Sequence, residues 1–372
     1  MVVKNNKTIL FFCSYQSVYG GNFIPSLIAL EESIKQTGNS CIYLFPMSSE
    51  ERYWFKQMQN MGKQVYTFNF NQSRYKLIKQ LSNFVKQHNI NLIHSHFAPI
   101  LPLEIFAFIH RNVKVFVHLH SDFSLGNTNI KVKLKNLILY KILALKVFFI
   151  SVSKAFVNYN SKKIVYVPNA LATERISCKQ YSGIEIRQKY NIKDNEILCE
   201  IFGWSPQVKG IDIAVEAIKR LNDKQSIYKL AIICGREMTT EKMPDWIEKN
   251  TSCTGKEKFL IYLPPQEDVF AYHKAADILI SASRSEGFPY SILEMLSLGK
   301  PCVISDIPGV SWAKKFSCSF VFPKQDIYAC AENIKNIYEN NKLLSDEKVS
   351  QKIKKEYSIN SWIKQIIKQY GI

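Results

Sequence analysis

Short apolar runs alternate along the chain with longer segments in which apolar residues recur at helical spacing. This alternation constrains the fold more than any other feature, because strands separated by helices form βα units and pair in parallel. In the first half we predict strands near 8–13, 41–45, 91–94, 115–119 and 147–152, and helices near 22–36, 73–88 and 131–145. In the second half we predict strands near 197–202, 229–234, 259–262, 277–281 and 302–304, and helices near 211–221, 267–275, 289–298 and 326–340.

The chain is long enough for two domains of this kind. It has 372 residues, and a single hydrophobic core rarely grows beyond about 250–300 residues. The segment Val165-Tyr166-Val167-Pro168-Asn169 divides the halves, because Pro168 ends a strand and a polar stretch follows it. We therefore expect an α/β chain of two doubly wound domains with a cleft between them. Ligands in such sheets bind at the carboxyl ends of the strands.

Positive charge is concentrated in the first half of the chain. Residues 1–168 hold 20 Lys and Arg against 6 Asp and Glu, and residues 169–372 hold 29 against 25, so +14 of the net +18 precedes residue 169. This asymmetry indicates an anionic partner, either a membrane surface, an anionic substrate or nucleic acid. A solubility bias toward lysine is the alternative. Nucleic acid ranks last, because aromatic residues do not alternate with the basic ones in a stacking pattern.

Cysteine usage and hydropathy bear on the compartment. The nine cysteines form no Cys-x-x-Cys pair, and several lie in apolar runs, which predicts reduced core thiols in a cytoplasmic setting. The apolar start at residues 9–13 is too short for a secretory signal. No run of eighteen apolar residues occurs, so we expect no membrane-spanning helix.

Two glutamates stand eight residues apart in the stretch RSEGFPYSILEML, residues 284–296. Glu286 lies in the loop after the predicted strand 277–281, and Glu294 lies on the second turn of the next helix. Carboxylates at such positions accept hydrogen bonds from sugar or ribose hydroxyls. A solvated helix face is the alternative reading of Glu294.

The start of this helix is a predicted anion site. Pro289 suits the first turn of a helix, because its missing N–H would be unpaired there in any case. The main-chain N–H groups of Phe288, Tyr290 and Ser291 then face the carboxyl end of the sheet, where they can bind an anion.

Five motifs together resemble glycosyltransferase family 4, whose members have the GT-B fold and retain the anomeric configuration of the sugar. They occur in the order of the family along most of the chain. They are Tyr19-Gly20-Gly21, His118-Leu119-His120-Ser121-Asp122, Val167-Pro168-Asn169, the segment 203–210 (GWSPQVKG), and the two glutamates followed by Gly299-Lys300-Pro301 and Ser305-Asp306-Ile307-Pro308-Gly309.

The resemblance implies a GT-B chain of two Rossmann-like domains facing a central cleft. Residues 1–168 would form the acceptor-side domain and residues 169–355 the domain that binds the nucleotide sugar. Residues 356–372 would form a helix that crosses back to the first domain, with Trp362 and Ile366 as anchors.

The resemblance also assigns roles to single residues. His120, Glu286 and Lys209 would be catalytic, with His120 facing the donor sugar and Lys209 stabilising the leaving diphosphate. The implied donor-binding residues are Gly21, Gly203, Lys209, Arg236, Arg284, Gly287, Phe288, Pro289, Tyr290, Ser291 and Glu294, with Glu294 on the ribose. The implied acceptor-side residues are Gly20, Asn22, His96 and Asp122.

One position departs from the family. The residue after Gly203 is usually Arg, and here it is Trp204. One cation of the usual pair is therefore missing, and Arg236 or Arg284 would have to supply it.

The implied reaction moves a sugar from a nucleotide diphosphate sugar to a hydroxyl of a glycan, lipid-linked or polymeric acceptor, with no cofactor. No Asp-x-Asp sequence occurs, so we expect no metal ion on the diphosphate. Positive charge would come instead from Lys209, an arginine and the helix start at 288–291. No covalent nucleophile stands out, which agrees with a front-face displacement in which the leaving phosphate helps to deprotonate the acceptor.

Residues 129–150 carry five lysines among Leu, Ile and Tyr. This segment can lie on an anionic membrane, where each lysine contributes about 1 kcal/mol. A core helix with a lysine-coated outer face is the alternative. On the first interpretation the enzyme is a peripheral protein on the inner face of the membrane.

Two other functions fit the same fold. A nucleotide-sugar epimerase or a phosphorylase is one, and an epimerase would turn over its donor without an acceptor. A non-catalytic GT-B subunit that partners another transferase is the second. Trp204 favours the subunit slightly, whereas Glu286, Glu294 and Lys209 argue against it.

Overall fold

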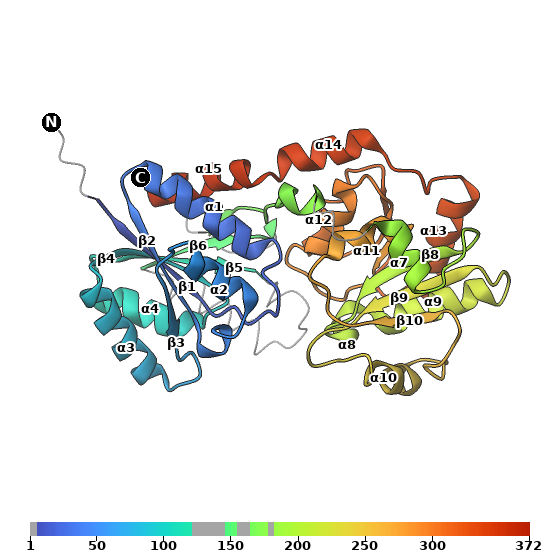
Figure 1. The fold of residues 1–372 in the computed structure, drawn as a ribbon, viewed down its shortest axis with the longest axis horizontal. Coiled ribbons are helices and arrows are strands. Elements are labelled where there is room, and N and C mark those ends of the chain that lie inside the picture. The colour runs from blue at the N-terminus through green and yellow to red at the C-terminus, as the bar shows by residue number, and fades with distance from the viewer. Residues whose placement is uncertain (1–5, 121–145, 155–163, 178–181) are drawn as a thin grey trace. The chain divides into compact units, whose positions relative to one another are not determined.

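The computed structural model describes residues 6–120, 146–154, 164–177 and 182–372. The chain forms two compact units. Unit 1 comprises Met1–Ala170 and Ile359–Ile372, and unit 2 comprises Leu171–Ser358. Each unit is an α/β layer structure built on one parallel sheet (Figure 1).

Unit 1 has a seven-stranded sheet in the order β3-β2-β1-β4-β5-β6-β7, and each neighbouring pair is parallel. Its strands are β1 (Thr8–Cys13), β2 (Ser40–Pro46), β3 (Val65–Phe68), β4 (Ile90–His96), β5 (Lys114–Leu119), β6 (Val147–Ser151) and β7 (Ile164–Tyr166). Its helices are α1 (Phe23–Gln36), η1 (Met47–Ser49), α2 (Tyr53–Asn60), α3 (Arg74–Gln87), α4 (Ile100–Ile109) and α15 (Ile359–Tyr370).

Apolar side chains cover both faces of this sheet. Helices α1, α2 and α15 bury Leu27, Trp54 and Ile366 in one core cluster, and Trp362 lies in the same cluster. Helices α3 and α4 bury residues such as Leu81 and Phe106 in a second cluster on the opposite face. A sheet covered on both faces is what parallel βα units require.

Unit 2 repeats this plan with the parallel order β10-β9-β8-β11-β12-β13. Its strands are β8 (Ile197–Phe202), β9 (Tyr228–Ile233), β10 (Leu260–Leu263), β11 (Ile278–Ser281), β12 (Cys302–Ser305) and β13 (Ser319–Phe322). Its helices are η3 (Thr173–Ser177), α7 (Gly183–Lys189), α8 (Pro206–Lys209), α9 (Ile211–Asn222), α10 (Met243–Asn250), α11 (Val269–Ala275), α12 (Tyr290–Ser297), η4 (Pro308–Val310), α13 (Ile327–Glu339) and α14 (Glu347–Glu356).

The predicted α/β class with two doubly wound parallel sheets is confirmed. The prediction missed the edge strands β3 and β13, because only the last residue of each is fully buried and their apolar signal is weak. It also missed helices α2, α4, α10 and α14. The helix predicted over 131–145 lies outside the described residues.

The strand order reverses direction at one point in each sheet. In unit 1 the reversal lies between β1 and β4, and in unit 2 between β8 and β11. The loops after two such neighbouring strands diverge to opposite faces and leave a crevice at the carboxyl edge. Candidate ligand-binding residues are therefore those that follow β1, β4, β8 and β11.

Candidate functional site

Lys209 and Glu286 meet at the reversal point of unit 2. Lys209 ends α8 in the loop that follows β8, and Glu286 lies in the loop that follows β11. Lys209 Nζ lies 2.5 Å from Glu286 Oε1, and Ser283 Oγ donates to the same oxygen at 2.8 Å. Each of the two charged side chains keeps 12% of its surface exposed. The structure thus brings together two of the residues predicted to be catalytic, 77 positions apart in sequence.

Two glycines allow these loops to approach so closely. Gly210 has φ +68°, and a Cβ there would lie 2.1 Å from the carbonyl oxygen of Ala282. At Gly309 a Cβ would lie 1.8 Å from the carbonyl oxygen of Glu286. A side chain at either position would push the loops apart. The Lys-Gly and Pro-Gly pairs seen in the sequence therefore have a steric reason.

The predicted donor-side arginines differ in what they contact. Arg284 forms a two-pronged ion pair with Asp212, at 2.9 and 2.6 Å, and donates to the Gln207 carbonyl oxygen at 2.6 Å. Its charge is thus used to tie the β11 loop to α8 and α9. Arg236 is exposed, and it forms no ion pair with another residue that the structure describes. Of the two candidates, Arg236 is the one whose charge is not matched by a carboxylate.

Trp204, which stands where the family has Arg, packs against this region. A Cβ at Gly235 would lie 2.5 Å from the Trp204 Cβ, so the tryptophan lies directly on the backbone beside Arg236. Lys209 Nζ lies 5.2 Å from the centre of the indole ring. This distance is within the range of a cation–π contact. Gly203 itself is enclosed, since a Cβ there would lie 2.9 Å from side-chain atoms of Ile232 and Met243.

The predicted helix start is present at the end of the β11 loop. Helix α12 begins at Tyr290, so Pro289 is its extended N-cap and does not lie in the first turn as predicted, and no side chain caps the helix. Gly287 and Phe288 are buried, and the Phe288 ring stacks on Trp312 with centroids 4.2 Å apart. This stacking holds the chain in place where it enters α12. Ser291, in the first turn of α12, is partly buried.

Glu294 does not lie on a solvated helix face, since only 5% of it is exposed. Arg175 donates to Glu294 Oε1 at 2.9 Å, and His273 Nε2 lies 3.2 Å from Oε2. Burial raises the pKa of Glu294, but the hydrogen bond from His273 and the charge of Arg175 outweigh burial and lower the pKa below its usual value. Glu294 is therefore a buried, ionised carboxylate.

Sequence reasoning missed three residues of this group, namely Arg175, Glu200 and His273. His273 Nδ1 hydrogen-bonds Glu200 Oε1. Glu200 could have been identified from the sequence, because it is the one charged residue within the otherwise apolar strand Ile197–Phe202. Arg175 and His273 carried no comparable signal.

In unit 1 the predicted glycine loop follows β1. The Tyr15 hydroxyl donates to the carbonyl oxygens of Tyr19 and Gly20, at 2.9 and 3.3 Å. Gly21 has φ +54°, a left-handed conformation that favours glycine. Asn22 is buried and is the N-cap of α1.

His120 follows β5 and lies against aromatic and imidazole rings. Its ring stacks on Phe97 with centroids 4.1 Å apart, and its Nε2 lies 2.9 Å from His96 Nδ1. Burial lowers the pKa of His120 to about 3, so the imidazole is neutral at physiological pH. His96 is only 1% exposed, so its ring is not open to direct contact with a ligand in this structure. Asp122 lies outside the described residues.

His94 and His118 belong to the same cluster of imidazole rings as His96 and His120. His94 Nε2 lies 3.2 Å from His118 Nδ1, and His94 Nδ1 lies 2.5 Å from the Tyr370 hydroxyl of α15. Nitrogen atoms of His94, His96 and His118 lie within 4.8 Å of one another, close enough for a shared metal ion. Both ring nitrogens of His94 hydrogen-bond neighbours, whereas Nε2 of His96 and Nε2 of His118 have no hydrogen-bond partner among the described residues. No carboxylate or thiolate joins the group among the residues that the structure describes. The absence of a metal therefore stays a prediction.

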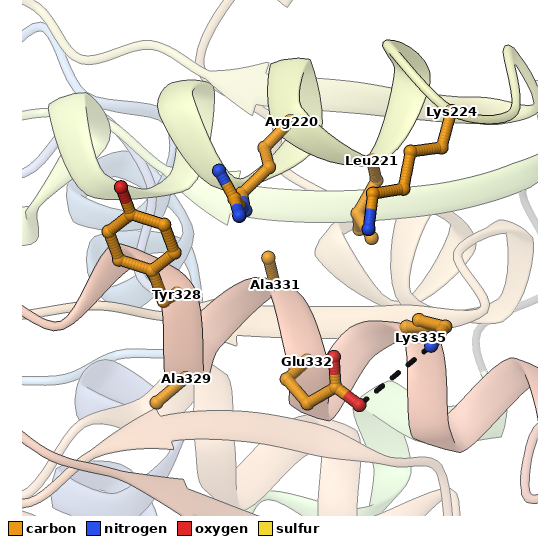
Figure 2. Close-up of a pocket in the computed structure, with 8 residues that line it drawn as sticks. All are labelled: Arg220, Leu221, Lys224, Tyr328, Ala329, Ala331, Glu332 and Lys335. Atoms are coloured by element: carbon orange, nitrogen blue, oxygen red, sulfur yellow. Dashed lines mark ion pairs between the residues drawn. The ribbon is translucent and has the colours of Figure 1, made fainter.

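A surface groove of about 340 Å³ lies elsewhere in unit 2, between α9 and α13 (Figure 2). Arg220, Lys224 and Lys335 line it, together with Tyr328 and Glu332. None of the predicted site residues is among its lining residues, so this groove is not part of the predicted site. Its charged residues Arg220, Lys224 and Glu332 are exposed.

In the part of the chain that the structure describes, no helix combines the length and apolarity needed to cross a bilayer. Most of the lysine-rich segment 129–150 lies outside the described residues.

Comparison with known proteins finds a family match within the second unit. Residues 183–356 match the family model described as "Glycosyl transferases group 1", and the match covers a little under half of the chain. The O-antigen biosynthesis glycosyltransferase WclY of Escherichia coli is 27% identical over 131 residues, which cover 35% of each protein. An uncharacterized glycosyltransferase of Methanocaldococcus jannaschii, MJ1178, is 24% identical over 61% of this chain and 59% of its own length. The chain therefore matches about a third of the first relative.

Similarity to solved structures covers nearly the whole chain and not only residues 183–356. The crystal structure of Anabaena Alr3699/HepE in complex with UDP and glucose has a TM-score of 0.78, with 16% identity, and the match covers 98% of this chain and 100% of that one. At this identity the likeness shows the fold alone. It confirms the expected GT-B fold class, with two Rossmann-like units.

Proposed function

We propose that this protein is a retaining, metal-independent glycosyltransferase. It would move a sugar from a nucleotide diphosphate sugar to a hydroxyl of a glycan, lipid-linked or polymeric acceptor. The observation that carries the proposal is the pairing of Lys209 with Glu286 at the reversal point of the unit 2 sheet, 2.5 Å apart. Cell-surface polysaccharide synthesis is the proposed setting, because WclY is described as an O-antigen enzyme.

The charges at this point suit a diphosphate leaving group. Lys209 supplies a cation, and the start of α12 supplies oriented main-chain dipoles from residues 288–291. Preorganised groups of this kind stabilise the charge that develops on the leaving oxygen, and one donor typically contributes about 3 kcal/mol. When a donor binds, Lys209 would turn from Glu286 to the phosphate, and Glu286 would accept a sugar hydroxyl.

Two further roles complete the proposal. Glu294, ionised and fixed, would bind the ribose hydroxyls. His120 of unit 1 would face the donor sugar, and as a neutral imidazole it would act by hydrogen bonding rather than as a cation.

Thermal-shift measurements against a panel of nucleotide sugars test donor binding. A bound donor raises the unfolding temperature by mass action, and UDP-sugars come first because HepE was solved with UDP. Lys209→Ala should abolish the shift, and Lys224→Ala, in the groove of Figure 2, should keep it. A panel with no shift would contradict the proposal.

Product stereochemistry and metal dependence test the reaction. NMR of the fresh product should show the anomeric configuration of the donor, and EDTA should leave turnover unchanged. Inversion would exclude the retaining mechanism, and activity that returns only on adding a divalent ion would exclude metal independence. Donor turnover without an acceptor would indicate an epimerase instead.

We also propose cytoplasmic location with peripheral binding to an anionic membrane through the basic first half of the chain. The protein should bind vesicles that contain phosphatidylserine, and should bind them less as salt rises, because exposed charges are screened. Equal binding to neutral vesicles would contradict this.

A further inference from the structure

Four charged residues form a chain that ends at α12, and three of them are buried while Arg175 keeps 18% of its side chain exposed. Glu200 of β8 is 1% exposed and hydrogen-bonds His273 Nδ1. His273 of α11 is fully buried, and its Nε2 lies 3.2 Å from Glu294 Oε2. Arg175 of η3 completes the chain by donating to Glu294 Oε1 at 2.9 Å. The order of groups is carboxylate, imidazole, carboxylate, guanidinium.

The charges along this chain alternate in sign. Burial alone would lower the pKa of His273, but the charge and hydrogen bond of Glu200 and those of Glu294 raise it to about 9. His273 is therefore an imidazolium at neutral pH and donates from both ring nitrogens. The imidazolium therefore lies between two carboxyl side chains, and the Arg175 guanidinium contacts the second of them. Buried charges persist when they are paired in this way.

The helix that carries His273 is itself held in place. Lys300 Nζ donates to the carbonyl oxygens of His273, Lys274 and Ala276, at 3.1, 2.6 and 2.7 Å. Asp268 caps the other end of α11 by accepting from the main-chain N–H of Ala271 at 3.3 Å. The imidazolium is thus fixed at both ends of its helix and through Glu200.

Arg175 is fixed from a different direction. Its guanidinium carbon lies 5.6 Å from the centre of the Phe270 ring, which also belongs to α11. Each oxygen of Glu294 therefore receives one charged donor, and both donors depend on α11. This arrangement restrains rotation of the carboxylate about its terminal torsion, which is otherwise broad.

We propose that His273 is a positioning residue, which fixes the plane of the Glu294 carboxylate for the paired 2′- and 3′-hydroxyls of a nucleoside, with Glu200 orienting His273 from behind. The inference rests on the proposed function. Its consequence is selectivity: a nucleotide with both hydroxyls is bound more tightly than one without them, and this preference depends on His273.

The preference is measurable as a ratio of two dissociation constants, the Kd of 2′,3′-dideoxy-UDP divided by the Kd of UDP. Calorimetry with UDP and with 2′,3′-dideoxy-UDP gives the ratio for the wild type, for which we expect on the order of tenfold or more, as for hydrogen bonds to a charged group. A loss of affinity for UDP alone lowers this ratio. A general disturbance of the site weakens both ligands equally and leaves the ratio unchanged.

Two variants test the hydrogen bonds of the two His273 ring nitrogens separately, because each replaces one nitrogen with an amide of similar position. In His273→Gln the amide takes the place of Nε2 and can still donate to Glu294. In His273→Asn the amide takes the place of Nδ1 and reaches only Glu200. We expect the ratio to fall about tenfold in His273→Asn, toward one, and less in His273→Gln. Glu200→Gln, which keeps the size of the side chain, should also lower the ratio and serves if the His273 variants fail to fold.

The control is Lys224→Ala, an exposed residue in the turn that follows α9, which should keep the wild-type ratio. An unchanged ratio in folded His273→Asn, or equal losses for both nucleotides, would overturn the inference. A wild type that binds neither nucleotide nor any other nucleoside diphosphate would instead contradict the proposed function. The two failures are therefore distinguishable.

Discussion

At the scale of single residues, ion pairing separates the arginines that hold the fold from the arginine available to a ligand. Arg284 is bound by Asp212, and Arg187 is bound by Asp277 at 3.0 Å. Arg236 is exposed beside Trp204, whose ring lies 5.2 Å from Lys209 Nζ. Arg236 is therefore our candidate for the cation that Trp204 displaces.

Arg236→Ala should lower kcat/KM for the donor about 10- to 100-fold, because the leaving diphosphate loses a charged contact. Its unfolding temperature should stay unchanged, since the side chain is exposed. Steady-state kinetics and thermal unfolding together check this. Arg220→Ala, an exposed arginine in the groove of Figure 2, is the control. Full activity of Arg236→Ala would rule out this candidate.

At the scale of elements, the site depends on how closely η4 approaches the β11 loop. The backbone of Gly309 lies so near the Glu286 carbonyl that a methyl group has no room there. Glu286 thus owes its position partly to a loop in which no catalytic residue is predicted.

Gly309→Ala should therefore displace Glu286, weaken donor binding and destabilise the protein by about 1–3 kcal/mol, as overpacking does. Urea unfolding and donor titration measure the two effects. Gly62→Ala is the matched control. Gly62 has φ +70°, but a Cβ at this position would meet no atom within 4 Å, so the change should cost some stability and leave donor binding intact. Normal donor binding by Gly309→Ala would contradict this reasoning.

The loops after β8 and β11 could be predicted from sequence, because Gly, Pro and paired acids mark them locally. The chain of charged residues formed by Glu200, His273, Glu294 and Arg175 could not. Glu200 and His273 are 73 residues apart, and Arg175 and Glu294 are 119 apart. Nothing in the local sequence of α11 distinguishes His273 from an ordinary surface histidine, because its burial follows from tertiary packing alone. Similarly, pairing with Asp212 decides the role of Arg284, and no spacing rule reveals that pairing.

At the scale of the whole molecule, the two units should respond to pH in opposite directions. Burial lowers the pKa of His94 and His120 to about 3 and lowers the pKa of His96 and His118 well below the usual value. In unit 2 the pKa of His273 is raised to about 9. The first group favours the neutral form in the folded state, and the second favours the charged form.

Acid should therefore destabilise unit 1. As pH falls below about 6.5, the histidines of the unfolded chain bind protons, whereas the buried histidines of the folded chain stay neutral. Each histidine therefore lowers the free energy of unfolding by up to about 1.4 kcal/mol per pH unit. Unit 2 should instead lose stability as pH rises from about 6.5 to about 9, because in this range the unfolded chain releases a proton that folded His273 keeps. Hydrogen exchange read by mass spectrometry resolves the units. Unit 1 amides that exchange no faster at pH 5 than at pH 7, after correction for intrinsic rates, would contradict this.

Turnover of a nucleotide diphosphate sugar by Glu286→Gln tests the central claim most directly. This variant keeps the size of the side chain and removes the charge that Lys209 and Ser283 contact. We predict that release of nucleoside diphosphate falls about 100- to 1,000-fold, whereas Glu332→Gln, in the groove of Figure 2, keeps wild-type turnover. Undiminished turnover by folded Glu286→Gln would contradict the account.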